Sequence, residues 1–332
     1  MTYSRGLVLA ACVGTALTLY TLFGAQAEDK PIEVRLVDQF NALFGSHPGF
    51  RANHAKGVVL EGSFTPAPSA ASLSGAVFLQ KSPTPITVRF SNGGGLPDAP
   101  DTHPTGLTRG MAIKYHVPDG SEMDTVCISL NGFPVSNGED FLTFLKALGT
   151  SGPDTPKPTP LESFLAAHLA TAKIVSIPQP VPVSYATLPF YGVNAFKFTN
   201  AAGKTQFGRY RIVPVAGEAY LSDAEAAKRP PNILQDEIRA RIDKAPVKFK
   251  LLVQLAQPGD PTNDATQIWP DSRPAVELGE ISITKAVPDS LAAEKALLFL
   301  PTNLTAGIDE SDDPLIDVRT AAYAESYGRR TQ

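Results

Sequence analysis

The chain has few cysteines and lacks the short motifs of several common enzyme classes. Only Cys12 and Cys127 occur in its 332 residues. We expect Cys12 to be removed with an N-terminal leader, so the mature chain could form no internal disulfide. Cys127 lies in an apolar stretch and is interpreted as a buried strand residue. No paired-cysteine, His-Glu-x-x-His or Gly-x-Ser-x-Gly pattern is present, which excludes zinc sites of common spacing and the usual serine hydrolase elbow.

Clusters of like charge are also missing. The net charge is −4, and the acidic and basic residues are interspersed, so no basic face indicates a nucleic-acid partner. There are no repeats of solenoid period and no low-complexity tail. With 43% hydrophobic residues, the chain can bury a core large enough to enclose a cofactor.

The N-terminal segment has the pattern of a secretory signal. Arg5 precedes the apolar run 6–23, and Ala25-Gln26-Ala27 offers small residues for cleavage. We therefore predict a signal peptide over residues 1–27 and a single domain over residues 28–332, located in a bacterial periplasm or secreted, with no membrane contact after cleavage. Two alternatives stay open: retention of the run as a membrane anchor, and use of Leu9-Ala10-Ala11-Cys12 as a lipoprotein cleavage box.

Hydrophobic periodicity predicts strands framed by helices. Alternating or apolar runs predict eight strands, at 57–64, 86–90, 111–117, 125–129, 194–198, 206–214, 247–255 and 277–285. Helical patterns cover 31–44, 138–148, 160–172, 222–228 with 231–242, and 289–299. Eight strands in two blocks indicate an antiparallel barrel, so the predicted fold class is α+β.

Arg319 and Tyr323 form the most informative pair near the C-terminus. Residues four apart share one face of a helix, so the guanidinium can lie beside the phenol. A free tyrosine loses its proton only near pH ~10, and a phenolate at neutral pH needs a cation or a metal ion beside it. Tyrosine is an axial ligand of haem iron in some proteins. Alone, such a pair is more often a packing or cation–π contact; Tyr327 is the rival ligand but lacks an arginine four residues before it.

Several further motifs occur in one order along the chain with this pair, and together they resemble the haem catalase superfamily. The likeness is closer to its short members, the catalase-related peroxidases or mini-catalases. The motifs are Arg51-Ala-Asn-His54-Ala-Lys-Gly57, Val88-Arg89-Phe90-Ser91-Asn92, Arg109-Gly-Met-Ala-Ile-Lys-Tyr115, Leu130-Asn131-Gly-Phe-Pro134-Val135, Gln267-Ile-Trp269-Pro270 with Val276-Glu-Leu-Gly279, and Pro301-Thr-Asn303-Leu-Thr-Ala-Gly307-Ile308.

This resemblance implies a catalase-like, eight-stranded antiparallel β-barrel with flanking helices and a haem held beside it. The expected cofactor is a b-type haem with ferric iron. Because the sequence stops soon after the tyrosine motif, we expect no NADPH site. Family analogy alone favours a homodimer.

The resemblance also implies roles for the distal residues. His54 would be the acid–base group that moves a proton between the two peroxide oxygens. Ser91 would bond the imidazole and fix its tautomer, and Asn131 would hold the distal oxygen of peroxide. Outside this context, His54 and Asn131 would be interpreted as turn residues.

The remaining roles concern the cofactor itself. Tyr323 would ligate the iron as a phenolate, with Arg319 stabilising its negative charge. Arg51 and Arg89 would bind the haem propionates, because a planar guanidinium pairs bidentately with a carboxylate. A strand charge that faces solvent is the alternative for Arg89.

The activity implied is that of a haem peroxidase. It would reduce hydrogen peroxide, and organic hydroperoxides as a second substrate class, with a small organic electron donor, and would have weak catalase activity. Two alternatives come from other classes: a haem carrier or sensor without turnover, and a haem isomerase acting on lipid hydroperoxides.

Overall fold

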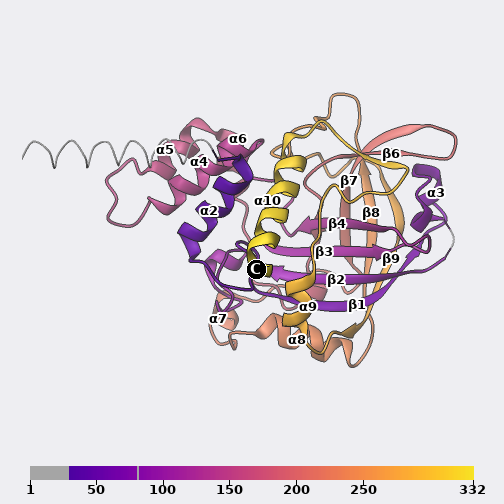
Figure 1. Cartoon of the computed structure of the whole chain (residues 1–332), viewed down its shortest axis with the longest axis horizontal. Coiled ribbons are helices and arrows are strands. Elements are labelled where there is room, and N and C mark those ends of the chain that lie inside the picture. The colour runs from indigo at the N-terminus through magenta and orange to yellow at the C-terminus, as the bar shows by residue number, and fades with distance from the viewer. Residues whose placement is uncertain (1–29, 81) are drawn as a thin grey trace, which may run out of the picture.

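The computed structural model describes residues 30–80 and 82–332 (Figure 1). The predicted signal segment, residues 1–27, lies outside the described residues. Within the described ranges, no helix combines the length and the apolar character needed to cross a bilayer.

Eight antiparallel strands close into a barrel, which confirms the predicted fold. Around the ring the order is β7, β5, β4, β3, β2, β1, β9 and β8, and β8 pairs back with β7. The ring strands are β1 (Gly57–Pro66), β2 (Thr84–Asn92), β3 (Arg109–His116), β4 (Glu122–Ile128), β5 (Phe190–Tyr191), β7 (Thr205–Pro214), β8 (Val247–Leu255) and β9 (Ala275–Ala286). Outside the ring, β6 (Phe196–Thr199) pairs with β7, and β10 (Ile308–Glu310) pairs with β6.

One strand of the predicted set does not belong to the ring. Residues 194–198 were expected to form a barrel strand, but their segment, β6, lies outside it. The ring is completed instead by the two residues of β5, where Tyr191 pairs with Ile128 on one side and Arg211 on the other. A strand of two residues is too short to produce a detectable alternation, so the sequence pattern missed it.

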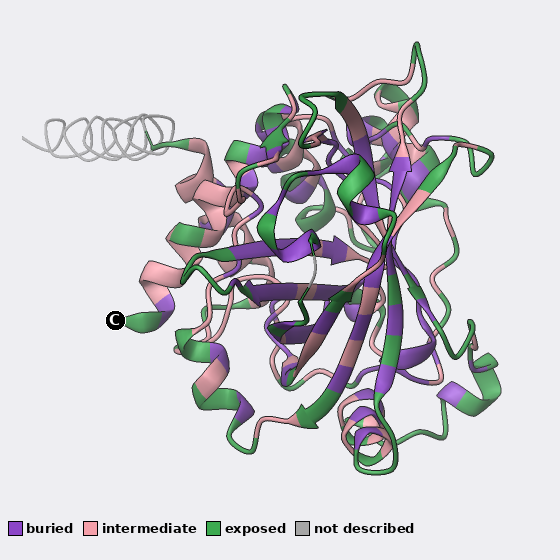
Figure 2. Ribbon diagram, turned by 90° about the vertical axis from the view of Figure 1, so that its right-hand side faces the viewer, coloured by how far each residue is buried: buried purple, intermediate pink, exposed green. Residues whose placement is uncertain are grey.

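Alternation along β2 separates the core from the outer wall of the barrel. Val88 and Phe90 are fully buried in the main hydrophobic core, whereas Arg89 and Ser91 line a cavity outside it. This follows from strand geometry, since successive side chains point to opposite faces. Figure 2 shows the long buried stretches of the barrel strands.

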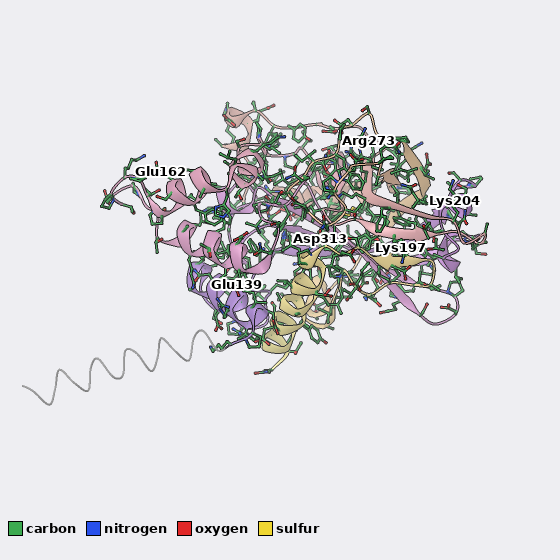
Figure 3. The ribbon with its side chains drawn as sticks, turned by 90° about the horizontal axis from the view of Figure 1, so that it is seen from above. Glu139, Glu162, Lys197, Lys204, Arg273 and Asp313 are labelled. Atoms are coloured by element: carbon green, nitrogen blue, oxygen red, sulfur yellow. The ribbon has the colours of Figure 1, made fainter. Side chains whose placement is uncertain are left out.

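The helices gather mainly on one side of the barrel. Those among the described residues are α2 (Ile32–Phe44), α3 (Ala70–Leu73), α4 (Gly138–Gly149), α5 (Pro160–Ala167), α6 (Leu169–Val175), α7 (Asp223–Ala226), α8 (Ile233–Ile242), α9 (Ser290–Ala296) and α10 (Pro314–Thr331). A small core of Leu36, Leu142 and Leu145 with Val318 joins α2, α4 and α10. In Figure 1, α10 stands between α2 and the barrel, and Figure 3 labels Asp313, the N-cap residue directly before α10.

The helix predicted over 160–172 is divided in two. His168 has φ −124° and ψ 75°, outside the helical region, and ends α5 before α6 begins. At the start of α5, the Thr159 hydroxyl accepts a bond from the Glu162 N–H, and the Glu162 carboxylate accepts one from the Thr159 N–H. This capping box explains why α5 begins where the sequence predicted. Figure 3 labels Glu162 at the end of the molecule distant from Lys204.

Candidate functional site

A cavity of about 420 Å³ lies between the outer wall of the barrel and the helices α2, α4 and α10. Side chains of β2, β3 and β4 form one wall. The loop before β1 contributes His54, and α10 contributes Tyr323, so residues from both ends of the described chain line one space. The volume falls within the range of cofactor pockets, about 300–1,000 Å³.

Most of the cavity wall is apolar. Phe40 on α2, Phe144 on α4 and Met111 on β3 belong to it. Leu148 and Val175 line it as well, although 42% and 41% of their surfaces are exposed, and they therefore mark its mouth. The wall is suited to a large apolar ligand with a few polar attachment points.

The backbone of His54 adopts an unusual conformation that several contacts hold. Its φ is +55°, the one positive φ of a residue other than glycine in the described ranges. Arg89 Nη2 donates to the His54 carbonyl oxygen at 2.8 Å. Just before it, the Asn53 side-chain oxygen accepts a bond from the Gly94 N–H at 2.8 Å. Such a conformation persists only where its surroundings fix it, which makes this a candidate functional position.

The imidazole of His54 is fixed as well. Its Nδ1 lies 3.0 Å from Ser91 Oγ. The ring passes over Gly110, where a Cβ would lie 2.6 Å from Ser91 Oγ and 3.1 Å from His54 Nδ1, so no larger residue fits. When Nδ1 donates its proton to Ser91, Nε2 keeps a free lone pair and can act as a base. The structure thus brings two of the three predicted distal residues together.

Burial lowers the pKa of His54 to about 3, and the positive charges of Arg89, Arg319, Arg51 and Arg109 add to this effect. A buried imidazole without a carboxylate partner is destabilised in its charged form. The ring is therefore neutral across the physiological pH range, which a general base requires.

Three arginines and one glutamate meet at one edge of the cavity. We call Arg51, Arg89 and Arg330 with Glu294 the arginine cluster. Glu294 Oε2 lies 2.7 Å from Arg89 Nη2, 3.0 Å from Arg89 Nε and 3.4 Å from Arg51 Nη1. The Leu297 carbonyl accepts bonds from both Arg51 and Arg330.

The arginine cluster carries more positive charge than negative charge. Three guanidinium groups face one carboxylate, which leaves two positive charges uncompensated. Burial and the neighbouring guanidinium groups of Arg89 and Arg330 lower the pKa of Arg51 well below its usual value, although Glu294 acts in the opposite direction. Burial likewise lowers the pKa of Arg330 to about 10. A ligand with two carboxylates would balance this edge.

The helix α10, which also carries Arg330, presents Tyr323 to the cavity together with Arg319. Arg319 Nε and Nη2 donate to Tyr323 Oη at 3.3 and 3.2 Å. Arg319 also donates to the side-chain oxygen of Asn194, whose amide donates to Asp313 at 2.8 Å. Because the Arg319 guanidinium is held from behind, it stays directed at the phenol oxygen.

Two other predicted positions lie differently. Tyr327, the rival ligand, does not line the cavity. Its ring packs against the Arg330 guanidinium, whose Cζ lies 4.7 Å from the centre of the Tyr327 ring. Asn131 is half-buried between Leu130 and Phe133, which do line the cavity, but its own side chain is not part of the wall. The structure therefore does not join Asn131 to His54 and Ser91.

A buried polar network supports the His54 loop from below. Lys56 Nζ lies 2.8 Å from Asp101 Oδ1, and Asp101 also accepts bonds from the Asn92 amide and the Leu234 N–H, each at 2.7 Å. Tyr185 Oη donates to the Asn92 side-chain oxygen at 2.7 Å. Lys56 is two residues beyond His54 and Asn92 directly follows Ser91, so this network positions both distal residues.

Sequence reasoning missed several members of these sites. Glu294, Arg330, Asn194 and Asp101 were not predicted, because most of their partners lie far away along the chain. The Arg89–Glu294 contact, for example, spans 205 residues. Their one sequence signal is polarity inside otherwise apolar or turn segments, which is weak without knowledge of the partner.

Comparisons with known proteins found relatives that match nearly the whole chain. The family model described as Catalase matches residues 36–331. A catalase-related peroxidase of Mycolicibacterium paratuberculosis is 37% identical over 298 residues, covering 89% of this chain and 93% of that protein. Another, from Synechococcus elongatus, is 30% identical over 328 residues, covering 98% of this chain and 94% of that protein.

A solved structure supports the fold. The crystal structure of a fungal catalase superposes with a TM-score of 0.75 at 21% identity, over 86% of this chain and 60% of that chain. The chain thus spans about three fifths of that catalase.

The Lys56–Asp101 pair gives a prediction about stability. Lys56→Met removes the ammonium group that lies 2.8 Å from the fully buried Asp101 carboxylate, so we expect the free energy of unfolding to fall by about 3–5 kcal/mol. The double variant Lys56→Met with Asp101→Asn should lose less than the sum of the two single losses, because neither member of the pair is left charged without the other. Denaturant unfolding measures both. A Lys56→Met protein within about 1 kcal/mol of the wild type would contradict the role given to this pair.

Proposed function

This chain belongs to the catalase family, and we propose on that premise that it is a haem-dependent peroxidase, which reduces hydrogen peroxide with electrons from a small organic donor. One observation carries the proposal. A single apolar cavity holds a fixed imidazole, a phenol paired with an arginine, and an arginine cluster with two uncompensated charges.

These residues fit a b-type haem with ferric iron. The apolar wall suits a porphyrin, Tyr323 would ligate the iron as phenolate, and the arginine cluster would pair with the two propionates. Bound there, haem would supply the iron redox chemistry that the reduction of peroxide requires. All the residues that would hold the haem come from this chain. The two negative charges of the propionates equal the two uncompensated positive charges of the arginine cluster.

His54 performs the proton transfer in this proposal. Its neutral Nε2 would take the proton from one peroxide oxygen and return it to the oxygen that leaves as water. Ser91 holds the ring so that Nε2, and not Nδ1, faces the substrate. The role of Asn131 as a hydrogen-bond donor to peroxide rests on the sequence resemblance alone.

Neither alternative function is favoured. A haem carrier or sensor needs no base, so it would not require an imidazole whose backbone, ring and protonation are all constrained. The relatives that cover nearly the whole chain are catalase-related peroxidases, which favours peroxide reduction over isomerisation of lipid hydroperoxides.

Other parts of the proposal rest on the sequence. We propose that residues 1–27 direct export and are cleaved, which places a single mature domain in the bacterial periplasm or outside the cell. Assembly as a homodimer rests on family analogy and stays a prediction.

The two tyrosines of α10 provide a matched test of the iron ligand. We expect Tyr323→Phe to lower haem affinity more than about a hundredfold, since it removes the ligand itself and not just a partner of a ligand. Tyr327→Phe should load haem normally, because Tyr327 lies outside the cavity wall. Haem content per chain and the absorption spectrum report both results. An unchanged spectrum in Tyr323→Phe would refute the assignment.

Replacing the distal residues should separate chemistry from haem binding. His54→Gln should retain haem yet slow the reaction with hydrogen peroxide by about 10²–10⁴, the usual contribution of a general base. Ser91→Ala should slow it less, by about 10–100-fold, because the base is still present but no longer oriented. Stopped-flow absorption measures these rates. Equal rates for His54→Gln and the wild type would rule out His54 as the base.

The lowered pKa of His54 predicts an unusually flat pH profile. An imidazole with a pKa near 3 stays neutral from pH 8 to pH 5, so the peroxide rate constant should change little over that range. Propionates would offset part of the arginine effect, but burial, the largest cause, would remain. A histidine with the ordinary pKa of about 6.5 would lose roughly thirtyfold at pH 5. A fall centred near pH 6.5 would therefore contradict the structure.

A further inference from the structure

A second cavity, of about 540 Å³, lies beside the arginine cluster on the side away from the first cavity. It is open to solvent and is lined by the start of β1, the loop with Pro97 and Asp98, and residues of α8 and α9. Figure 1 shows α8 and α9 at the lower end of the barrel, next to β1. This cavity plays no part in the chemistry assigned to His54 and Tyr323.

The lining of the second cavity has unused hydrogen-bonding groups. Among residues 30–80 and 82–332, the side chains of Asp98, Asn232 and Gln235 make no hydrogen bond. Asp98 and Asn232 are exposed at the rim, and Gln235 is half-buried. Phe50 and Leu291 add apolar surface to the same wall. Amide and carboxylate groups around an apolar wall suit a small ring that carries hydroxyl groups.

The wall between the two cavities is one layer of residues thick. Glu294 lines the second cavity, while its carboxylate contacts Arg89 and Arg51, which line the first. Gly57 lines the second cavity too, and a Cβ on it would lie 2.4 Å from Arg89 Nη2. The absence of a side chain at Gly57 therefore lets the guanidinium lie against the backbone that forms the cavity floor.

We propose that the second cavity binds the electron donor, and that this donor is a small hydroxylated aromatic molecule. The inference rests on the proposed peroxidase function, with haem propionates at the arginine cluster. Electrons would then enter at the propionate edge, across the layer of Gly57 and Glu294. Peroxide would use the first cavity, so donor and oxidant would not compete for space.

The stoichiometry balances with one-electron oxidations. For each hydrogen peroxide reduced to two water molecules, two donor molecules each break one O–H bond. Each loses one electron and one proton and leaves as a phenoxyl radical, and the two protons end in water. The Asp98 carboxylate at the rim can accept the hydrogen bond of the hydroxyl that loses its proton.

The test uses the haem-loaded protein with catechol as the probe. Gln235→Phe fills the second cavity from α8, and Ala240→Phe is the matched control, an exposed site on the same helix outside that cavity. We expect Gln235→Phe to raise the dissociation constant of catechol, measured by calorimetry, and its KM by about tenfold or more. Asn232→Leu should raise both about threefold to tenfold, the effect of one uncharged hydrogen bond. Ala240→Phe should leave both near the wild-type values.

Two results would overturn the proposal. One is unchanged catechol binding and KM in Gln235→Phe. The other is a rise in the catechol KM in Leu148→Trp that is as large as the rise in Gln235→Phe. Leu148→Trp narrows the mouth of the first cavity, so this result would place the donor in the first cavity. Failure of the proposed function looks different, because a protein that binds no haem, or that oxidises no donor with peroxide, would fail before any variant is compared.

Discussion

Uncompensated positive charge at one edge of the cavity is the constraint on which the site depends. Arg89 and Arg330 are each only 4% exposed, and Glu294 alone faces them and Arg51. Unpaired charges in a protein interior cost several kcal/mol each. An anionic ligand that balances this edge binds the folded state and not the unfolded chain, so its binding free energy adds directly to stability. Folding and cofactor binding are thus coupled through the same guanidinium groups.

The same charges set the protonation of the distal base. Arg89 and Arg51 face the edge of the cavity, yet they also disfavour a positive charge on His54. Arg89 contributes a third effect, since it donates to the His54 carbonyl and so holds a backbone with φ +55°. A non-glycine residue in that region costs on the order of 1–3 kcal/mol. Arg89, which is suited to bind a propionate, therefore also holds the backbone of His54 and lowers the pKa of its imidazole. It does so from the strand β2, where the barrel wall faces the cavity.

Much of the fold could be predicted from the sequence, because strong periodicity marks the long elements. Seven of the eight predicted strands belong to the barrel, and β6 was misplaced because the two-residue β5 carries no pattern. The Arg319–Tyr323 contact followed from helix spacing alone. Contacts between distant segments could not be predicted in this way. Glu294 and Asp101 are ordinary acidic residues until the fold brings Arg89 and Lys56 to them, and the spacing around Asn131 does not show where its side chain lies relative to His54.

The site is formed by two parts of the fold, the wall of the barrel and the helix α10. Arg89 and Ser91 stand on a closed barrel, whose strands are fixed on both sides by neighbours. Tyr323 comes from α10, which packs against α2 and reaches the distal loop through the Ala52 N–H and the Ser326 hydroxyl, 274 residues apart. Both this contact and the β1–β9 pairing that closes the barrel, such as Leu60 with Ala286, join segments far apart in the sequence, so both must repay loop-closure entropy. Arg89 and Ser91 are therefore positioned by the barrel, whereas Tyr323 and Arg330 are added when α10 docks, so a ligand that bridges the two walls stabilises the docking of α10.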